Sequence, residues 1–168
     1  MSDQQVVVRR KLHVNGVVQG VGFRPFVYRL AKQCDVAGWV RNTSNDVQIE
    51  VEGSPDSLDE FVRRIKSDAP TLAQVERITT EDTEPEGAQG FAILEGEHAG
   101  STEALIPADV ATCSECFDEI ADPNARRTRY PFTNCTNCGP RFTIVRGVPY
   151  DRANTTMAAF EMCPDCAA

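Results

Sequence analysis

The sequence predicts an α+β chain, with a ferredoxin-like domain of β-α-β-β-α-β order followed by a small zinc-ribbon-like module. Residues 6–94 alternate strand-like and helix-like segments. From about residue 104 onward the chain is rich in Cys, Pro and Arg and has little helical periodicity. A length of 168 residues suits one medium domain with an appendage, and 41% hydrophobic residues are typical of a globular protein.

The first half of the ferredoxin-like domain predicts a strand and then a helix. Residues 6–14 (VVVRRKLHV) are rich in β-branched side chains and predict a strand. In residues 23–35 Pro25 fits a first helical turn, where a missing N–H costs little. The same segment is predicted to be an amphipathic helix because one face gathers Phe23, Phe26, Val27, Leu30, Ala31 and Cys34.

The second half predicts a hairpin, a helix and the last strands. Residues 36–43 and 47–53 read as two strands joined by a tight Ser-Asn-Asp turn. Residues 54–67 open with a Ser N-cap and a Pro, and apolar residues then recur at helical spacing. Residues 73–82 and 90–94 follow as strands. We therefore expect a four-stranded antiparallel sheet, with a candidate fifth strand at an edge.

The loop between the first strand and the first helix has the composition of an anion site. Residues 14–26 read VNGVVQGVGFRPF and lack the Gly-Lys-Ser/Thr of a Walker loop and the G-x-G-x-x-G order of a dinucleotide fingerprint. Its glycines allow successive N–H groups to converge at a helix N-terminus, with Arg24 in the first turn. From the loop alone, a plain βα turn with a surface Arg remains the alternative.

Six of the seven cysteines form C-x-x-C pairs, and Cys34 stands alone as an expected small buried residue. The start of the chain lacks the apolar run of a secretory signal, so we expect a cytoplasmic protein with reduced thiols. The first two pairs have C-x2-C-x18-C-x2-C spacing, which predicts one structural zinc site and disfavours a redox pair. Its expected ligands are Cys113, Cys116, Cys135 and Cys138.

Cys163 and Cys166 repeat the first pair and are expected to be half of a second metal site. The chain would then end inside a second module. From about residue 150 we expect either loose packing or stabilisation by a contact that the intact chain would not make. The expected domain boundaries are the ferredoxin-like domain at 6–96, a linker at 97–108, a four-cysteine module at 109–150 and a truncated module at 151–168.

The motif V-x-G-x-V-Q-G-V-G-F-R resembles the signature of the acylphosphatase family, and GWVRNTSNDVQIEVEG resembles its second signature. The resemblance implies that family's sandwich fold for about residues 8–95. It also implies that Arg24 is the catalytic, phosphate-binding Arg and that Asn42 positions the attacking water. His13 lies mid-strand and is expected to pack or face solvent rather than act as a base. The implied phosphate cradle comprises backbone amides of Val18, Gln19, Gly20, Val21, Gly22 and Phe23 together with Arg24.

An acylphosphatase-like domain followed by such cysteine modules is similar to the N-terminal part of the carbamoyltransferases that mature [NiFe]-hydrogenases. This resemblance implies cleavage of carbamoyl phosphate and passage of carbamate to downstream domains of the same protein. There ATP would activate the carbamate for transfer to a cysteine of a maturation partner, on the way to the cyanide ligands.

Two other function classes remain as alternatives at this level. One is a free-standing acylphosphatase with a structural zinc appendage, and the other is a ferredoxin-like nucleic-acid-binding module with a zinc ribbon. A net charge of −8 and 7% aromatic residues disfavour nucleic acid, and the basic stretch RRTRYPF is expected to be a solvated turn. No apolar run has membrane-spanning length, so we expect no membrane partner.

Overall fold

The computed structural model describes residues 6–98 and 104–164, and it confirms the predicted α+β fold. Its first part follows the predicted element order, with a fifth strand added. The elements are β1 (Val8–Val17), α1 (Phe23–Gln33), β2 (Ala37–Asn42), β3 (Val47–Gly53), α2 (Pro55–Ser67), β4 (Gln74–Thr83) and β5 (Phe91–Ile93). None of the helices in these described ranges is long and apolar enough to cross a membrane.

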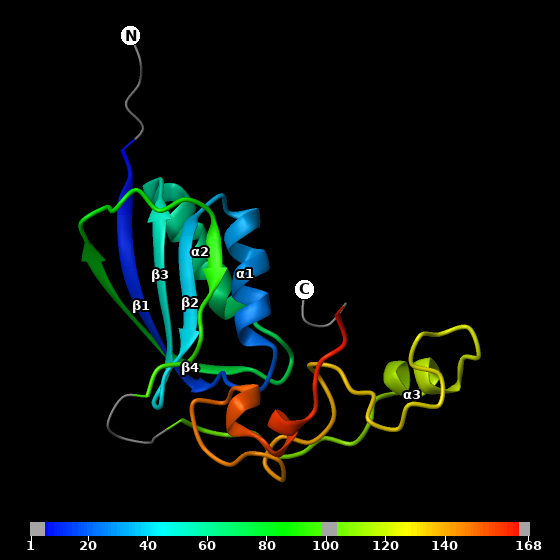
Figure 1. The fold of residues 1–168 in the computed structure, drawn as a ribbon. Coiled ribbons are helices and arrows are strands. Elements are labelled where there is room, and N and C mark those ends of the chain that lie inside the picture. Colours follow the sequence, from blue (N-terminus) through cyan, green and yellow to red (C-terminus); the bar gives the residue numbers. More distant parts are fainter. Residues whose placement is uncertain (1–5, 99–103, 165–168) are drawn as a thin grey trace.

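The sheet has the strand order β4-β1-β3-β2-β5. The first four strands pair antiparallel, as predicted, whereas β5 pairs parallel with β2 and forms the fifth, edge strand. Helices α1 and α2 lie together on one face of the sheet (Figure 1). This arrangement brings the β1–α1 loop and the end of β2 to the same end of the sheet.

The hydrophobic core lies between the two helices and the inward face of the sheet. Alternate residues of β1 and β3 point inward, as the period of a half-buried strand requires. Cys34 is buried among them, as predicted from its helical position. The fully buried large side chains of this core include Leu12, Phe23, Leu30, Ile49, Leu58, Phe61 and Ile65.

Local signals explain where α2 and the β2–β3 hairpin begin and end. Ser54 is the N-cap of α2, and its Oγ accepts a hydrogen bond from the backbone N–H of Ser57 at 3.1 Å. In the hairpin turn, Thr43 N donates to the Asp46 carbonyl at 2.9 Å. This turn follows directly on Asn42, the last residue of β2.

The second part of the chain differs from the sequence prediction in two ways. A helix, α3 (Ser114–Ala121), begins immediately after Cys113, where little helical periodicity was visible. Only Cys116 of this helix is buried, so no apolar stripe marked it. Of the two outcomes expected from residue 150, loose packing does not hold for residues 150–155: two short 3-10 helices (Arg152–Asn154 and Thr156–Ala159) follow Tyr150, and Thr155 is buried. Figure 1 shows this segment against the end of the sheet that carries the β1–α1 loop.

Candidate active site and metal centre

The β1–α1 loop carries a run of backbone N–H groups that have no hydrogen-bond partner among the described residues. Gly20 and Gly22 have φ of 70° and 73°, a left-handed conformation that glycine adopts without strain. Within the described parts of the chain, no backbone hydrogen bond is donated by the N–H groups of residues 19–24. Alternating positive φ directs successive N–H groups to one side, and the N-terminus of α1 adds its dipole. The loop therefore has the geometry of a cradle for a phosphoryl group.

Arg24 and Asn42 come together at this cradle from two separate elements. Arg24 lies in the first turn of α1, and Asn42 is the last residue of β2, with 1% of its surface exposed. Arg24 Nη2 and Asn42 Nδ2 both donate to the backbone carbonyl of Tyr150, at 3.3 and 3.0 Å. The two side chains predicted to be catalytic thus converge on one oxygen atom. Asn42 Oδ1 is buried and has no hydrogen-bond partner within residues 6–98 and 104–164.

Gln19 joins the cradle to the hairpin turn beside Asn42. Its side chain is buried, and Nε2 donates to the carbonyls of Thr43 and Asp46 at 2.8 and 3.0 Å. Its Oε1 accepts from the backbone N–H of Tyr150 at 2.7 Å. A single amide therefore fixes the cradle, the turn after β2 and the C-terminal segment relative to one another. His13 is not among these contacts: its Nδ1 is 2.7 Å from Asp46 Oδ2, and the ring is partly exposed.

The second part of the chain covers the cradle. Asp151 Oδ1 pairs with Arg24 Nη1 at 2.6 Å, and its other oxygen accepts from Gly96 N at 2.9 Å. Arg141, with 2% exposure, donates from Nε to the carbonyl of Gly20 at 2.8 Å. A groove of about 1310 Å³ lies between the two parts of the chain and is lined by Arg24, Asn42 and Tyr150 among others. The cradle therefore opens into a cavity that has one wall from each part.

The structure brings together the four cysteines predicted as metal ligands. Their Sγ atoms all lie within 4.8 Å of one another. The neighbouring Sγ–Sγ separations are 3.8 Å for Cys113–Cys135 and Cys135–Cys138 and 3.6 Å for Cys116–Cys138. A tetrahedral site with Zn–S bonds of about 2.3 Å requires sulfur atoms about 3.8 Å apart. The cluster therefore has the dimensions of a four-thiolate metal site.

The two buried thiols of this cluster differ in their ease of ionisation. Burial raises the pKa of Cys116 well above its ordinary value. Burial acts in the same direction on Cys138, but backbone N–H groups and neighbouring thiols outweigh it and lower the pKa of Cys138 to about 7. A thiolate is the form that binds a metal. Cys163 is exposed and outside the cluster, and its expected partner Cys166 lies outside the described residues.

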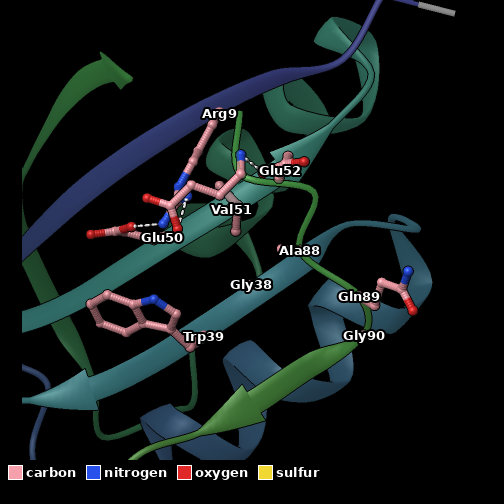
Figure 2. A pocket seen from close by; sticks show the side chains of 10 residues that line it. Arg9, Gly38, Trp39, Glu50, Val51, Glu52, Ala88, Gln89 and Gly90 are labelled. Carbon is pink, nitrogen blue, oxygen red and sulfur yellow. Dashed lines mark hydrogen bonds and ion pairs between the residues drawn. The ribbon is translucent and has the colours of Figure 1, made fainter. Parts of the chain in front are cut away.

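A second, smaller cavity of about 190 Å³ lies between β2, β3 and the segment that leads to β5 (Figure 2). Arg9 points into it and pairs with Glu50 and with Glu86. The Glu52 carboxylate accepts from the backbone N–H groups of Glu86 and Gly87 at 2.8 and 2.9 Å. These contacts attach the segment before β5 to the sheet, so we assign the cavity a structural role.

Sequence reasoning missed the residues that the second part of the chain contributes to the cradle. Arg141 and Tyr150 lie more than 100 residues from Gly20 along the chain. The available signal was an Arg and a Tyr beside prolines, in the stretches GPRF and VPYDR, within a region poor in large core residues. That signal indicated turns but not the surface on which they pack.

Comparison with known proteins identifies two regions of the chain. A family model described as Acylphosphatase matches residues 10–93, and one described as HypF finger matches residues 112–145. A carbamoyltransferase HypF2 from Cupriavidus necator is 50% identical over 158 residues, which cover 93% of this chain and 20% of that protein. An acylphosphatase from Thermotoga petrophila is 40% identical over 84 residues, which cover 49% of this chain and 92% of that enzyme. The chain thus spans about a fifth of the carbamoyltransferase relative.

Solved structures give the same two likenesses. The chain superimposes on a full-length HypF in the phosphate- and nucleotide-bound form with a TM-score of 0.92 and 41% identity, covering 96% of this chain and 21% of that one. It superimposes on the acylphosphatase of Bacillus subtilis with a TM-score of 0.50 and 35% identity, covering 52% of this chain and 98% of that enzyme. The likeness to HypF therefore includes the second part of the chain, which the acylphosphatase does not match.

Proposed function

Because this chain belongs to the acylphosphatase family and joins that enzyme domain to a HypF finger, we propose that it hydrolyses an acyl phosphate, with carbamoyl phosphate as the substrate. One observation carries the proposal. Arg24 and Asn42 direct hydrogen-bond donors at the same point beside a loop whose amides have no partner in the described residues. A positive charge, a polar amide and convergent N–H groups are what a phosphoryl group and its attacking water require.

In the proposed reaction, the amides of residues 19–24 and the Arg24 guanidinium hold the phosphoryl oxygens. An acyl phosphate is an activated anhydride, so positioning and charge stabilisation suffice and no protein nucleophile is needed. The oxygen of a water forms a bond to phosphorus while the bond from phosphorus to the acyl oxygen breaks. The products are inorganic phosphate and, from carbamoyl phosphate, carbamate, and the protons of the water remain with the phosphate and solvent.

The orientation of Asn42 supports its role with the water. Asn42 Nδ2 donates to the Tyr150 carbonyl. If the Asn42 amide were rotated by 180°, its Oδ1 would face that carbonyl oxygen, and two acceptors cannot form a hydrogen bond. Asn42 Oδ1 is consequently the atom left to accept a hydrogen bond, and none of the residues that the structure describes donates to it. We propose that Oδ1 accepts from the attacking water and holds it beside the phosphoryl group.

We propose that the four-cysteine cluster binds zinc in a structural role. Cys113, Cys116, Cys135 and Cys138 would supply four thiolates, which leaves no open position for substrate. When bound, the metal would cross-link a region that has few buried apolar residues of its own. The cluster would thereby hold the segment that reaches the cradle.

The remaining proposals concern a longer protein of the carbamoyltransferase type. There, carbamate released at the cradle would pass to downstream domains, be activated with ATP and be transferred to a cysteine of a partner in [NiFe]-hydrogenase maturation. Within this chain we propose a first domain at 6–96, a linker at 97–108, a finger at 109–150 and the start of a second finger at 151–168, with Cys163 and Cys166 as two of its ligands.

Phosphate release from carbamoyl phosphate tests the proposed hydrolysis. Arg24→Ala should lower kcat/KM by a factor of about 100 or more, because a charge-assisted contact to the reacting group is lost. Arg24→Lys should restore only part of the rate, since Lys keeps the charge but not the bidentate geometry. Arg29→Ala, at an exposed position of the same helix, is the matched control and should retain the rate. A folded Arg24→Ala variant with wild-type turnover would refute the proposal.

A further inference from the structure

The finger region is defined here as the described second part of the chain, residues 104–164. Within it, residues 149–151, here called the strap, contact the cradle and lie outside both the HypF finger match at 112–145 and the acylphosphatase match at 10–93. We propose that the side chain of Tyr150 limits the size of the acyl group, so that the site accepts small acyl phosphates such as carbamoyl or acetyl phosphate and disfavours aryl ones. The proposal rests on the proposed function and adds to it a specificity-determining residue. Tyr150 lies outside residues 10–93, which match the acylphosphatases.

The strap is fixed in place by contacts on both sides of Tyr150. The Tyr150 backbone is held at its N–H by Gln19 and at its carbonyl by Arg24 and Asn42. Asp151 adds the ion pair to Arg24 and accepts from Gly96 N, while Pro149 is buried. A Cβ on Gly96 would lie 2.2 Å from Asp151 Oδ2 and 2.5 Å from Pro149 Cγ, so the strap packs directly on the chain after β5. Movement of the Tyr150 backbone would therefore require the loss of contacts to both proposed catalytic side chains.

The ring of Tyr150 stands against the cradle itself. A Cβ built on Gly20 would lie 3.3 Å from Cδ1 and Cε1 of the ring and 3.4 Å from Cζ, which is closer than ordinary van der Waals contact. Burial raises the pKa of the Tyr150 phenol. Tyr150 also lines the groove into which Arg24 and Asn42 face. The ring is thus a half-buried wall of the cavity that the cradle opens into.

This position determines what can be attached to a bound phosphoryl group. With the phosphoryl oxygens on the cradle amides and Arg24, the acyl group has to extend into the groove, beside the Tyr150 ring. A carbamoyl or acetyl group adds only three heavy atoms beyond the bridging oxygen, whereas a benzoyl group adds a six-membered ring. Steric exclusion from a packed wall discriminates between substrates through kcat/KM. We therefore expect the strap to favour the small acyl group.

The test compares kcat/KM for carbamoyl, acetyl and benzoyl phosphate. Tyr150→Ala and Tyr150→Leu should each raise the benzoyl-to-carbamoyl ratio about tenfold or more, which is the scale of a pocket contact worth ~1.4 kcal/mol. Tyr150→Phe keeps the ring and should keep the ratio, and Tyr150→Trp should lower it. The inhibition constant of inorganic phosphate should stay within about threefold in the Phe variant, since the cradle is unchanged. Phe117→Ala, an exposed aromatic on α3, is the matched control for aromatic removal in the finger region.

The outcomes separate the two proposals. A ratio that stays within twofold of wild type in folded Ala, Leu and Trp variants overturns the role of Tyr150 and leaves the proposed hydrolysis standing. A wild-type chain that releases phosphate from none of the three compounds overturns both. If the Ala and Leu variants lose the circular dichroism signal of the wild-type fold, the Trp variant decides, and an unchanged ratio there counts against the proposal.

Discussion

Arg141 Nε donates a hydrogen bond to the carbonyl of Gly20 at 2.8 Å, so a buried guanidinium from the finger region holds one peptide of the cradle. In a trans peptide the C=O and the following N–H point in opposite directions. The bond from Arg141 therefore fixes the N–H of Val21, in the same peptide, on the side away from the Arg141 guanidinium. Arg141 also donates to the carbonyls of Gly139 and Thr136, so each of its three guanidinium nitrogens bonds to a carbonyl oxygen.

Arg141→Met should weaken both the cradle and the finger region. The substitution removes three hydrogen bonds and leaves the carbonyls of Gly20 and Thr136 without a partner among the described residues, whereas the Gly139 carbonyl still accepts from Val110 N–H. Each hydrogen bond to a charged group is worth about 1.5–3 kcal/mol. We expect a loss of roughly 3 kcal/mol in the free energy of unfolding and weaker inhibition by inorganic phosphate. Urea denaturation and phosphate inhibition measure these effects. Arg146→Met, at an exposed position of the same region, should change neither, and an equal response of the two variants would contradict the assignment.

Asn42→Ala should reduce turnover and spare anion binding. Its Oδ1 is the proposed partner of the attacking water, whereas the cradle amides and Arg24 hold the phosphate. We expect kcat for carbamoyl phosphate to fall by about 100-fold, the scale of one positioned polar group in an active site. The inhibition constant of phosphate should change by less than about threefold. Asn124→Ala, in an exposed turn of the finger region, serves as the control. An unchanged kcat in the Asn42 variant would remove the residue from the mechanism.

The sequence predicted the elements well because they depend on local signals. Three predicted features depend only on residues close together in the sequence, and each was confirmed. They are the Ser54 N-cap, the apolar face of α1 and the hairpin turn before Val47. The four-cysteine cluster was equally predictable, since ligand spacing is local to each pair. The helix after Cys113 was missed because it buries only Cys116 and so lacks an apolar period.

The contact between the finger region and the cradle could not be predicted in the same way. Arg141, Tyr150 and Asp151 reach the cradle through hydrogen bonds that are mostly to backbone carbonyl and N–H groups. Such bonds place little demand on the identity of the partner residue, so they leave no complementary pattern of charges or apolar residues in the sequence. Their formation depends on the path of the whole chain from β5 to residue 149, which only the folded structure supplies.

Glu52 should make the free energy of unfolding of the chain depend on pH. Hydrogen bonds from the backbone N–H groups of Glu86 and Gly87 lower the pKa of the Glu52 carboxyl below its ordinary 4.5. Because the folded-state pKa is the lower one, the carboxylate stabilises the fold above pH 4.5, and this contribution is lost as the pH falls through the folded value. Glu52→Gln should therefore lower the free energy of unfolding most at neutral pH.

Denaturant titrations between neutral and acidic pH measure this effect. The difference in the free energy of unfolding between wild type and Glu52→Gln should become smaller as the pH falls below the ordinary carboxyl pKa. Glu76→Gln, on the exposed side of the edge strand β4, should show no such narrowing. A constant difference between wild type and Glu52→Gln at every pH would mean that the charge of Glu52 has no part in holding the segment before β5.

Removal of the metal should change the preference between acyl phosphates without abolishing their hydrolysis. We expect one zinc per chain, bound by the four-cysteine cluster, and Cys113→Ser should lower that content, whereas Cys163→Ser, outside the cluster, should not. Without the metal, the finger region loses its cross-link and α3 its anchor at Cys116, so the strap is no longer held at the cradle.

The benzoyl-to-carbamoyl ratio of kcat/KM should then rise in the same direction as in Tyr150→Ala, while Arg24-dependent hydrolysis of benzoyl phosphate persists. Metal analysis and the three-substrate assay, before and after chelation, measure both effects. If chelation abolished hydrolysis of every acyl phosphate while the β-sheet signal remained, the metal would be required for the chemistry. A purely structural role for the cluster would then be wrong.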